Sequence, residues 1–212
     1  MDNGIVDAHP NRFKTMASER RSVRPSSLPR PEGEELLQGL RPRAGPALDI
    51  LAPNLRLLFV AINPSPLSAL AQQPFASPTN AFWRLLYVSG LTPVLITPDR
   101  ARCLLEFGCG LTSLVDRATR LASEVSSGER KHGAVRVLKI IHRVKPEVVA
   151  LLGPTIAPPF LDPHEHTGVG WKKGRLHDSD VFVLPNPSGR NRAYPGFQSK
   201  LHWYLELARR WQ

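Results

Sequence analysis

The sequence predicts an α/β fold of three layers, an α/β/α arrangement with a short, mainly parallel central sheet. Short runs of apolar, β-prone residues alternate with segments in which apolar residues recur at helical spacing. Strands that alternate with helices form mainly parallel sheets, and the helices cover both faces. The chain has 212 residues, of which 42% are hydrophobic, and this is enough for one domain with a core and a tail.

Residues 1–46 differ in composition from the rest of the chain. They mix Pro, Ser, Arg, Gly and Glu without a sustained period. Such a segment buries too little apolar surface to offset the entropy that it loses on ordering. We therefore expect a flexible tail over residues 1–46 and one folded domain over residues 47–212.

The elements of this domain can be predicted in chain order. An apolar run over residues 55–61 predicts the first strand, and helical spacing predicts a helix that begins near Phe82, after capping residues, and ends before Gly90. The later predictions are a helix over residues 134–144, strands over residues 147–153 and 181–184, and a final helix over residues 199–211.

The charge of the chain indicates a polyanionic partner, although a basic surface also serves membrane binding or solubility. The net charge is +10, and residues 1–46 contribute +2 of it (eight Lys or Arg, six Asp or Glu), which leaves +8 for residues 47–212. After residue 168, eight basic side chains stand against three acidic ones, and we expect a basic surface around the loop that follows residue 184. The eight are Lys172, Lys173, Arg175, Arg190, Arg192, Lys200, Arg209 and Arg210.

Several classes of protein are excluded by the same inspection. Two cysteines are too few for a disulfide framework, and the seven histidines show no ligand spacing such as His-Glu-x-x-His, so we expect neither a metal nor a cofactor. No run approaches the roughly 18 to 20 apolar residues of a membrane span, and the N-terminus lacks the apolar stretch of a secretory signal. We expect a cytoplasmic protein with no membrane partner.

Two Asn-Pro loops carry the functional signal. Residues 62–66 (Ile-Asn-Pro-Ser-Pro) follow the first predicted strand, and residues 185–190 (Pro-Asn-Pro-Ser-Gly-Arg) follow the third. Ligands of open α/β sheets bind outside the carboxyl ends of the strands, and a proline after asparagine holds that asparagine in an extended conformation. The two loops are therefore predicted to be halves of one active site.

From Asp49 to the C-terminus the chain resembles the mismatch-specific uracil/thymine DNA glycosylases. Each landmark is weak evidence alone, but five in the family's order and approximate spacing are strong. They are residues 62–64 (Ile-Asn-Pro), 74–76 (Pro-Phe-Ala), 80–83 (Asn-Ala-Phe-Trp), 109–119 (Cys-Gly-Leu-Thr-Ser-Leu-Val-Asp-Arg-Ala-Thr) and 186–189 (Asn-Pro-Ser-Gly). The resemblance implies a uracil-DNA glycosylase-like fold.

The resemblance also implies roles for the first loop and its surroundings. Asn63 matches the residue that positions the attacking water, and an amide can orient water but cannot take its proton as a carboxylate would. Phe75 matches the aromatic residue that stacks on the flipped base. Ser68 falls where the family keeps a small residue beside position 5 of the pyrimidine, and Ile62 and Asn186 complete the expected base pocket.

The second loop matches the part of the family that enters DNA. Gly189 and Arg190 correspond to the tip that fills the gap left by the flipped nucleotide. Some relatives have leucine at this wedge position and others arginine. Ser188 and Arg192 are expected to contact the DNA backbone beside the wedge.

The first loop departs from the family pattern at three positions. Ala61 and Ser65 replace two usual glycines, and Pro66 removes a backbone donor. A positive φ at Ser65 would strain or reshape the loop. Because backbone N–H groups of this loop help to read the base in relatives, the departures bear on base specificity.

The expected partner is double-stranded DNA with a mismatched or damaged base, bound by a monomer. The resemblance implies a monofunctional glycosylase that removes uracil from mismatches with guanine, with thymine or exocyclic cytosine adducts as further substrates. Two alternatives remain open at this point: a glycosylase for deaminated purines such as hypoxanthine, and a non-catalytic protein that binds damaged DNA.

Overall fold

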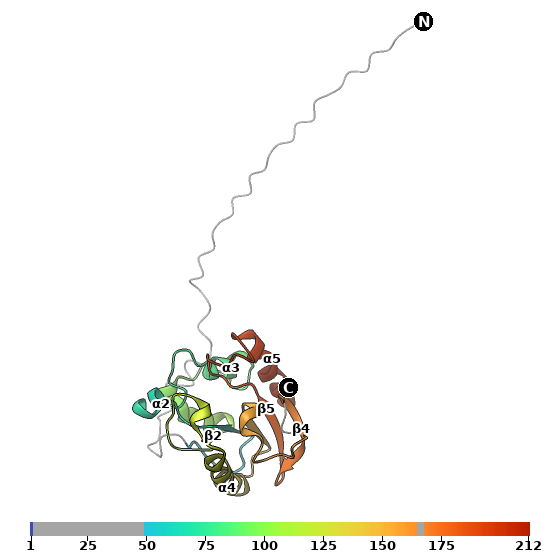
Figure 1. The fold of residues 1–212 in the computed structure, drawn as a ribbon. Coiled ribbons are helices and arrows are strands. Elements are labelled where there is room, and N and C mark those ends of the chain that lie inside the picture. The colour runs from blue at the N-terminus through green and yellow to red at the C-terminus, as the bar shows by residue number, and fades with distance from the viewer. Residues whose placement is uncertain (2–48, 165–167) are drawn as a thin grey trace. The chain divides into compact units, whose positions relative to one another are not determined.

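The computed structural model describes Met1 and residues 49–164 and 168–212 (Figure 1). The predicted tail over residues 1–46 lies, apart from Met1, outside these ranges. The fold is described by residues 49–164 and 168–212.

A five-stranded sheet with the order β2-β1-β3-β5-β4 forms the centre of the fold. Its strands are β1 (Leu57–Ala61), β2 (Cys109–Ser113), β3 (Val148–Leu152), β4 (Gly170–Leu176) and β5 (Ser179–Leu184). Strands β2, β1, β3 and β5 are parallel, and β4 pairs antiparallel to β5 at one edge. The sheet is therefore mainly parallel, as predicted.

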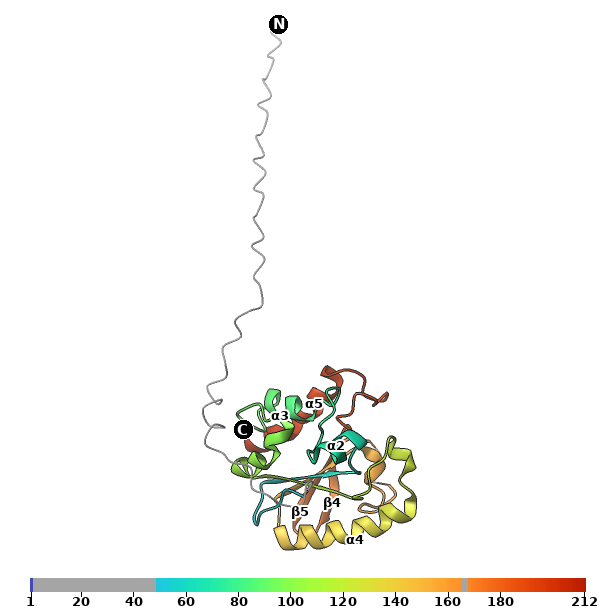
Figure 2. The same cartoon turned by 90° about the vertical axis from the view of Figure 1, so that its left-hand side faces the viewer.

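Helices cover both faces of the sheet, which confirms the three-layer fold class (Figure 2). The α-helices are α2 (Pro66–Ala71), α3 (Phe82–Val88), α4 (Ser127–Val144) and α5 (Gln198–Ala208). The 3-10 helices are η1 (Pro98–Phe107), η2 (Ala122–Glu124), η3 (Pro154–Ile156) and η4 (Arg209–Trp211). α3 and α5 lie on one face, and α4 lies on the other (Figure 2).

The alternation of side chains along β1 divides the core between the two faces. Leu57 and Phe59 pack in the cluster that contains α3 and α5, whereas Leu58 and Val60 pack in the cluster that contains α4. Every residue of β1 is buried. Burial on both faces is typical of a parallel strand covered by helices, and it explains why these strands appear as continuous apolar runs.

Helix α4 begins seven residues before the predicted start at residue 134. Ser126 is its N-cap, and Glu129 completes a capping box with it. The helix also packs closely on the chain after β2, since a Cβ at Gly133 would lie 2.0 Å from the carbonyl oxygen of Leu114. No helix of residues 49–164 and 168–212 has the length and apolarity to cross a membrane.

Candidate active site

The carboxyl ends of the four parallel strands lie side by side, and the chain that follows each strand contributes to the surface there. The segments are residues 62–65 after β1, 114–121 after β2, 153–156 after β3 and 185–191 after β5. Both Asn-Pro loops therefore leave the carboxyl ends of buried strands, as predicted. β3 lies between β1 and β5, so its loop separates the two on this surface.

The first loop leads directly into α2 without backbone strain. Ser65 has φ −76° and ψ 159°, an extended conformation, and its Oγ accepts a hydrogen bond from the backbone N of Ser68. Ser65 is thus the N-cap of α2, and Pro66 occupies the first turn, where a helix needs no N–H from it. The positive φ considered for Ser65 does not occur.

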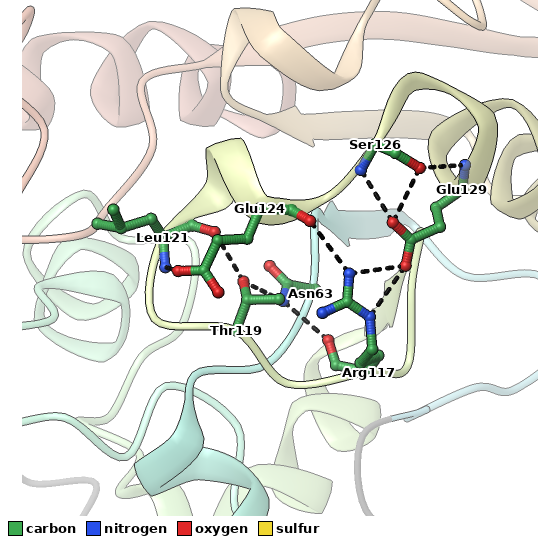
Figure 3. Close-up of polar contacts among 7 residues, drawn as sticks. All are labelled: Asn63, Arg117, Thr119, Leu121, Glu124, Ser126 and Glu129. Carbon is green, nitrogen blue, oxygen red and sulfur yellow. Dashed lines mark hydrogen bonds and ion pairs between the residues drawn. The ribbon is translucent and has the colours of Figure 1, made fainter.

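The Asn63 side chain is held by two hydrogen bonds in a single orientation (Figure 3). Its Nδ2 donates to the carbonyl oxygen of Arg117 at 2.9 Å and to Oγ1 of Thr119 at 2.8 Å. A carbonyl oxygen can only accept, so the nitrogen of the amide must face Arg117. Among the described residues no donor binds Oδ1 of Asn63, and this oxygen is left to accept a hydrogen bond from another molecule.

Backbone hydrogen bonds fasten the first loop to the segment after β2. The N–H groups of Leu114 and Val115 donate to the carbonyl oxygens of Ala61 and Ile62, with N–O distances of 2.8 and 2.9 Å. The N–H of Thr119 donates to the carbonyl oxygen of Pro64 at 3.2 Å. The landmark over residues 109–119, to which the sequence assigned no role, thus consists of β2 and the support of Asn63.

Phe75 and Ser68 lie next to this loop in different environments. The half-buried Phe75 ring rests on Phe82, with ring centroids 4.1 Å apart and planes 34° apart, and the Phe75 backbone has a positive φ of 54°. The Ser68 side chain is only 3% exposed, and its Oγ accepts a hydrogen bond from the N–H of Ala76 at 3.1 Å. Ser68 therefore holds the chain beside Phe75, and its expected place near a pyrimidine stays a prediction.

The second loop is stabilised by hydrogen bonds among its own residues. Oδ1 of Asn186 accepts from the N–H of Ser188 at 2.9 Å, and the carbonyl oxygen of Asn186 accepts from Nδ2 of Asn191 at 3.0 Å. The N–H of Arg190 donates to Oγ of Ser188 at 3.2 Å. The Oδ1 of Asn186 is thereby occupied, so this side chain presents its Nδ2 donors.

Close packing against another segment explains the glycine of this loop. A Cβ at Gly189 would lie 2.8 Å from the carbonyl oxygen of Thr79 and 3.1 Å from its Cβ. The N–H of Ala81 donates to the carbonyl oxygen of Pro187 at 3.1 Å. The second loop is thus joined to the chain between Phe75 and α3, and a larger residue at position 189 would separate them.

Arg190 connects the second loop to the segment that supports Asn63. Its Nη1 donates to the carbonyl oxygen of Arg120 at 2.6 Å, while Arg190 and Arg192 are both exposed. Residues 117–120 therefore contact a candidate site residue from each Asn-Pro loop, Asn63 from the first and Arg190 from the second. Local sequence does not indicate these contacts, because the partners are 54 to 70 residues apart in the chain.

The basic surface predicted around the second loop is only partly present, and the prediction was wrong for three residues. Lys200 is 2% exposed and donates to the carbonyl oxygens of two residues before α5, and its burial lowers its pKa. Arg175 and Arg210 pair with Asp180. Asp180 lies at the beginning of β5, near the amino ends of the parallel strands and therefore away from the two loops. Arg190 and Arg192 are the basic residues that the loop itself presents.

The described residues contain no group of three or more His, Cys, Asp or Glu side chains that could hold a metal ion. Cys103 and Cys109 are buried and free.

A comparison of the sequence with known protein families identifies the family of this chain. Residues 48–209 match the model of the uracil DNA glycosylase superfamily, whose members are DNA N-glycosylases of base excision repair. The match covers more than half of the chain and includes both Asn-Pro loops, and the chain therefore belongs to the uracil DNA glycosylase superfamily.

Proposed function

We propose that this protein is a monofunctional glycosylase that hydrolyses the N-glycosidic bond of uracil mispaired with guanine in double-stranded DNA. Thymine and exocyclic cytosine adducts opposite guanine are proposed as further substrates. The observation that carries the proposal is the Asn63 amide, which is held through Nδ2 and offers Oδ1 at the carboxyl edge of the sheet.

The proposed chemistry follows from what this amide can do. Oδ1 of Asn63 accepts a hydrogen bond from a water molecule and directs the water oxygen toward C1′ of the sugar. The bond between C1′ and the base nitrogen breaks and its electron pair leaves with the base. The water oxygen bonds to C1′ and loses one proton, and the departing base takes up one proton, so that the products are an abasic sugar and the free base. Because the bond to the base breaks before the water attacks, the water needs to be positioned but needs little activation. An amide, which orients the water without removing its proton, is therefore sufficient, and a carboxylate is not required.

The remaining residues are proposed to hold the flipped nucleotide. The Phe75 ring, which rests on Phe82, replaces the stacking that the base loses on leaving the helix. Asn186 offers donors where Asn63 offers an acceptor, so it suits an oxygen of the sugar or base. Arg190, at the exposed end of the second loop, is the proposed wedge.

The Asn63→Ala variant tests the proposed chemistry. We expect single-turnover excision of uracil from a G:U duplex to fall about 100-fold or more, the scale of losing a positioned catalytic group. Duplex binding should change little, since Asn63 acts on water. Asn54→Gly is a matched control that should leave excision unchanged. Asn54 is an exposed asparagine before β1, at the amino end of this strand, and glycine readily adopts its φ of 53°. Excision near the wild-type rate by Asn63→Ala would remove Asn63 from the mechanism.

A panel of substrates tests the proposed specificity. Release of free base would be measured from duplexes with G:U, G:T, A:U, an exocyclic cytosine adduct opposite guanine, and hypoxanthine, and from single-stranded uracil DNA. Preferential release from G:U supports the proposal. Preferential release of hypoxanthine would assign the site to deaminated purines, and tight binding of damaged duplex without release of any base would identify a non-catalytic binding protein.

A further inference from the structure

A series of contacts leads from Asn63 to the first turn of α4 (Figure 3). The backbone carbonyl of Arg117 holds the Asn63 amide, and the side chain of the same residue points to the helix. Its Nη2 and Nε donate to Oε1 of Glu129 at 2.8 and 3.0 Å, and Nη2 also donates to the carbonyl oxygen of Glu124 at 3.1 Å. Arg117 therefore contacts the catalytic loop through its backbone and α4 through its guanidinium group.

Glu129 is itself held in place by the helix N-cap. Its Oε2 accepts hydrogen bonds from N and Oγ of Ser126, both at 2.9 Å, while Oγ of Ser126 accepts from the N–H of Glu129. These bonds from Ser126, followed by the contact with Arg117, lower the pKa of Glu129 to about 2. Glu129 is therefore charged at every pH at which the protein would work.

The segment between Arg117 and Leu121 offers three acceptors to the two Asn-Pro loops. The carbonyl oxygen of Arg117 and Oγ1 of Thr119 bind Asn63, and the carbonyl oxygen of Arg120 binds Arg190. Oγ1 of Thr119 donates its proton to the carbonyl oxygen of Leu121 at 2.8 Å, so its lone pairs face Asn63. The place of this segment thus sets the orientation of the Asn63 amide.

We propose that Arg117 and Glu129 are positioning residues: their ion pair fixes residues 117–121 against the N-terminus of α4 and so aims Oδ1 of Asn63. The inference rests on the proposed function, in which this oxygen orients the attacking water. Neither side chain touches the substrate or the water.

The expected effect on rate is larger than the effect on stability. The side chains of Arg117 and Glu129 are 52% and 34% exposed, and ion pairs at such exposure contribute little to stability. In contrast, a displacement of about 1 Å in a catalytic arrangement can lower a rate about 100-fold. A change that only loosens residues 117–121 should therefore slow excision while the fold remains intact.

The test compares Arg117→Met, Arg117→Lys and Glu129→Gln in single-turnover excision from a G:U duplex. Arg117→Met should lower the maximal rate constant about 10- to 100-fold. The enzyme concentration that gives half of the maximal rate, which reports DNA binding, and the midpoint of thermal unfolding should both stay close to the wild-type values. Arg117→Lys, which keeps an ion pair with Glu129, should recover part of the loss. Glu129→Gln, which retains the capping box, should be slowed by the same factor at every pH from about 5 to 9, because the wild-type carboxylate does not titrate there.

The matched control is Arg175→Met, which breaks the ion pair between the exposed Arg175 and Asp180 at the beginning of β5, far from the two loops, and should leave excision unchanged. Adding Arg117→Met to Asn63→Ala should lower the rate no further, since Arg117 acts through Asn63. NMR provides a measure that needs no activity: in Arg117→Met the side-chain NH2 protons of Asn63 should exchange with water faster than in the wild type.

The outcomes separate this inference from the proposed function. If the wild type releases base and Asn63→Ala does not, a wild-type rate in Arg117→Met overturns the positioning role alone. The role is also overturned if Arg117→Lys is no faster than Arg117→Met, or if the Asn63 amide protons exchange as slowly in Arg117→Met as in the wild type. Absence of base release by the wild type would overturn the proposed function, and the inference with it.

Discussion

The Tyr204 hydroxyl is a polar group that the fold buries without a hydrogen-bond partner among the described residues. Tyr204 is 0% exposed and lies in the cluster between α5, α3 and the sheet. Burial raises the pKa of this phenol, so the side chain stays neutral. A buried hydroxyl without a partner has lost its hydration without compensation, and it should lower rather than raise the stability of the protein.

Replacement of Tyr204 by phenylalanine tests this reasoning. Tyr204→Phe keeps the ring and removes the unpaired oxygen, so we expect the free energy of unfolding to stay unchanged or to rise by about 1 kcal/mol. Urea denaturation of both proteins measures the difference. A loss of more than about 1 kcal/mol would indicate that the hydroxyl is bound by an internal water.

At the level of single residues, the sequence indicates candidate site residues but not the orientation of their side chains. The loop of Asn63 could be singled out because it follows an apolar strand, and Asn63 itself because it matches the water-positioning residue of the family that the chain resembles. The direction of its amide could not be predicted, because it depends on the carbonyl of Arg117, 54 positions away. Ser65 was expected to strain the loop if its φ were positive, but a local rule applies instead: serine followed by proline is a good helix start.

Among the elements, the strands with continuous apolar runs were predictable and the edge strands were not. β1, β3 and β5 are the inner strands and are apolar on both faces. β2 contains glycine, threonine and serine, and β4 (Gly-Trp-Lys-Lys-Gly-Arg-Leu) alternates between exposed and partly buried residues. Such short polar segments form strands because a neighbouring strand is available to pair with, which local sequence does not reveal.

The second loop is an element for which we propose a function of its own, the insertion of Arg190 into DNA. Its internal hydrogen bonds and its contact with Thr79 hold the backbone, while the Arg190 side chain at its end is exposed. A preordered loop can insert a side chain into DNA without first losing its own conformational entropy. The energy of filling the stack can then offset base flipping, which costs a few kcal/mol.

Substitutions of Arg190 test this role. Arg190→Ala should weaken binding to mismatched duplex and slow excision about 10- to 100-fold, if the wedge contributes about 1–3 kcal/mol. Arg190→Leu removes the charge but keeps bulk, and it should retain more duplex activity. Excision from single-stranded uracil DNA, if the wild type shows it, needs no unpairing and should suffer less. Equal losses by both variants on both substrates would mean that Arg190 only contacts phosphate or holds Arg120.

For the whole molecule, most of the excess positive charge lies in the part of the chain that matches the uracil DNA glycosylase superfamily. Residues 47–212 hold +8 of the net +10, and the match covers residues 48–209. Several basic residues are nevertheless engaged within the fold: Arg175 and Arg210 with Asp180, and Lys200 with backbone carbonyls. Composition could predict a polyanionic partner. It could not predict where the basic side chains lie on the surface, because this depends on how the fold orients each strand, helix and loop.

Removal of residues 1–46 tests whether the domain proposed over residues 47–212 is sufficient for binding and excision. The truncated protein should fold, excise uracil as the full chain does, and keep most of the salt dependence of DNA binding, because the release of counterions from phosphates depends on the basic residues of the domain. The slope of log affinity against log salt, measured for both proteins on the same G:U duplex, checks this, and circular dichroism checks folding. A truncated protein that has lost most of the slope would assign phosphate binding to residues 1–46. One that is unfolded would place the domain boundary before residue 47.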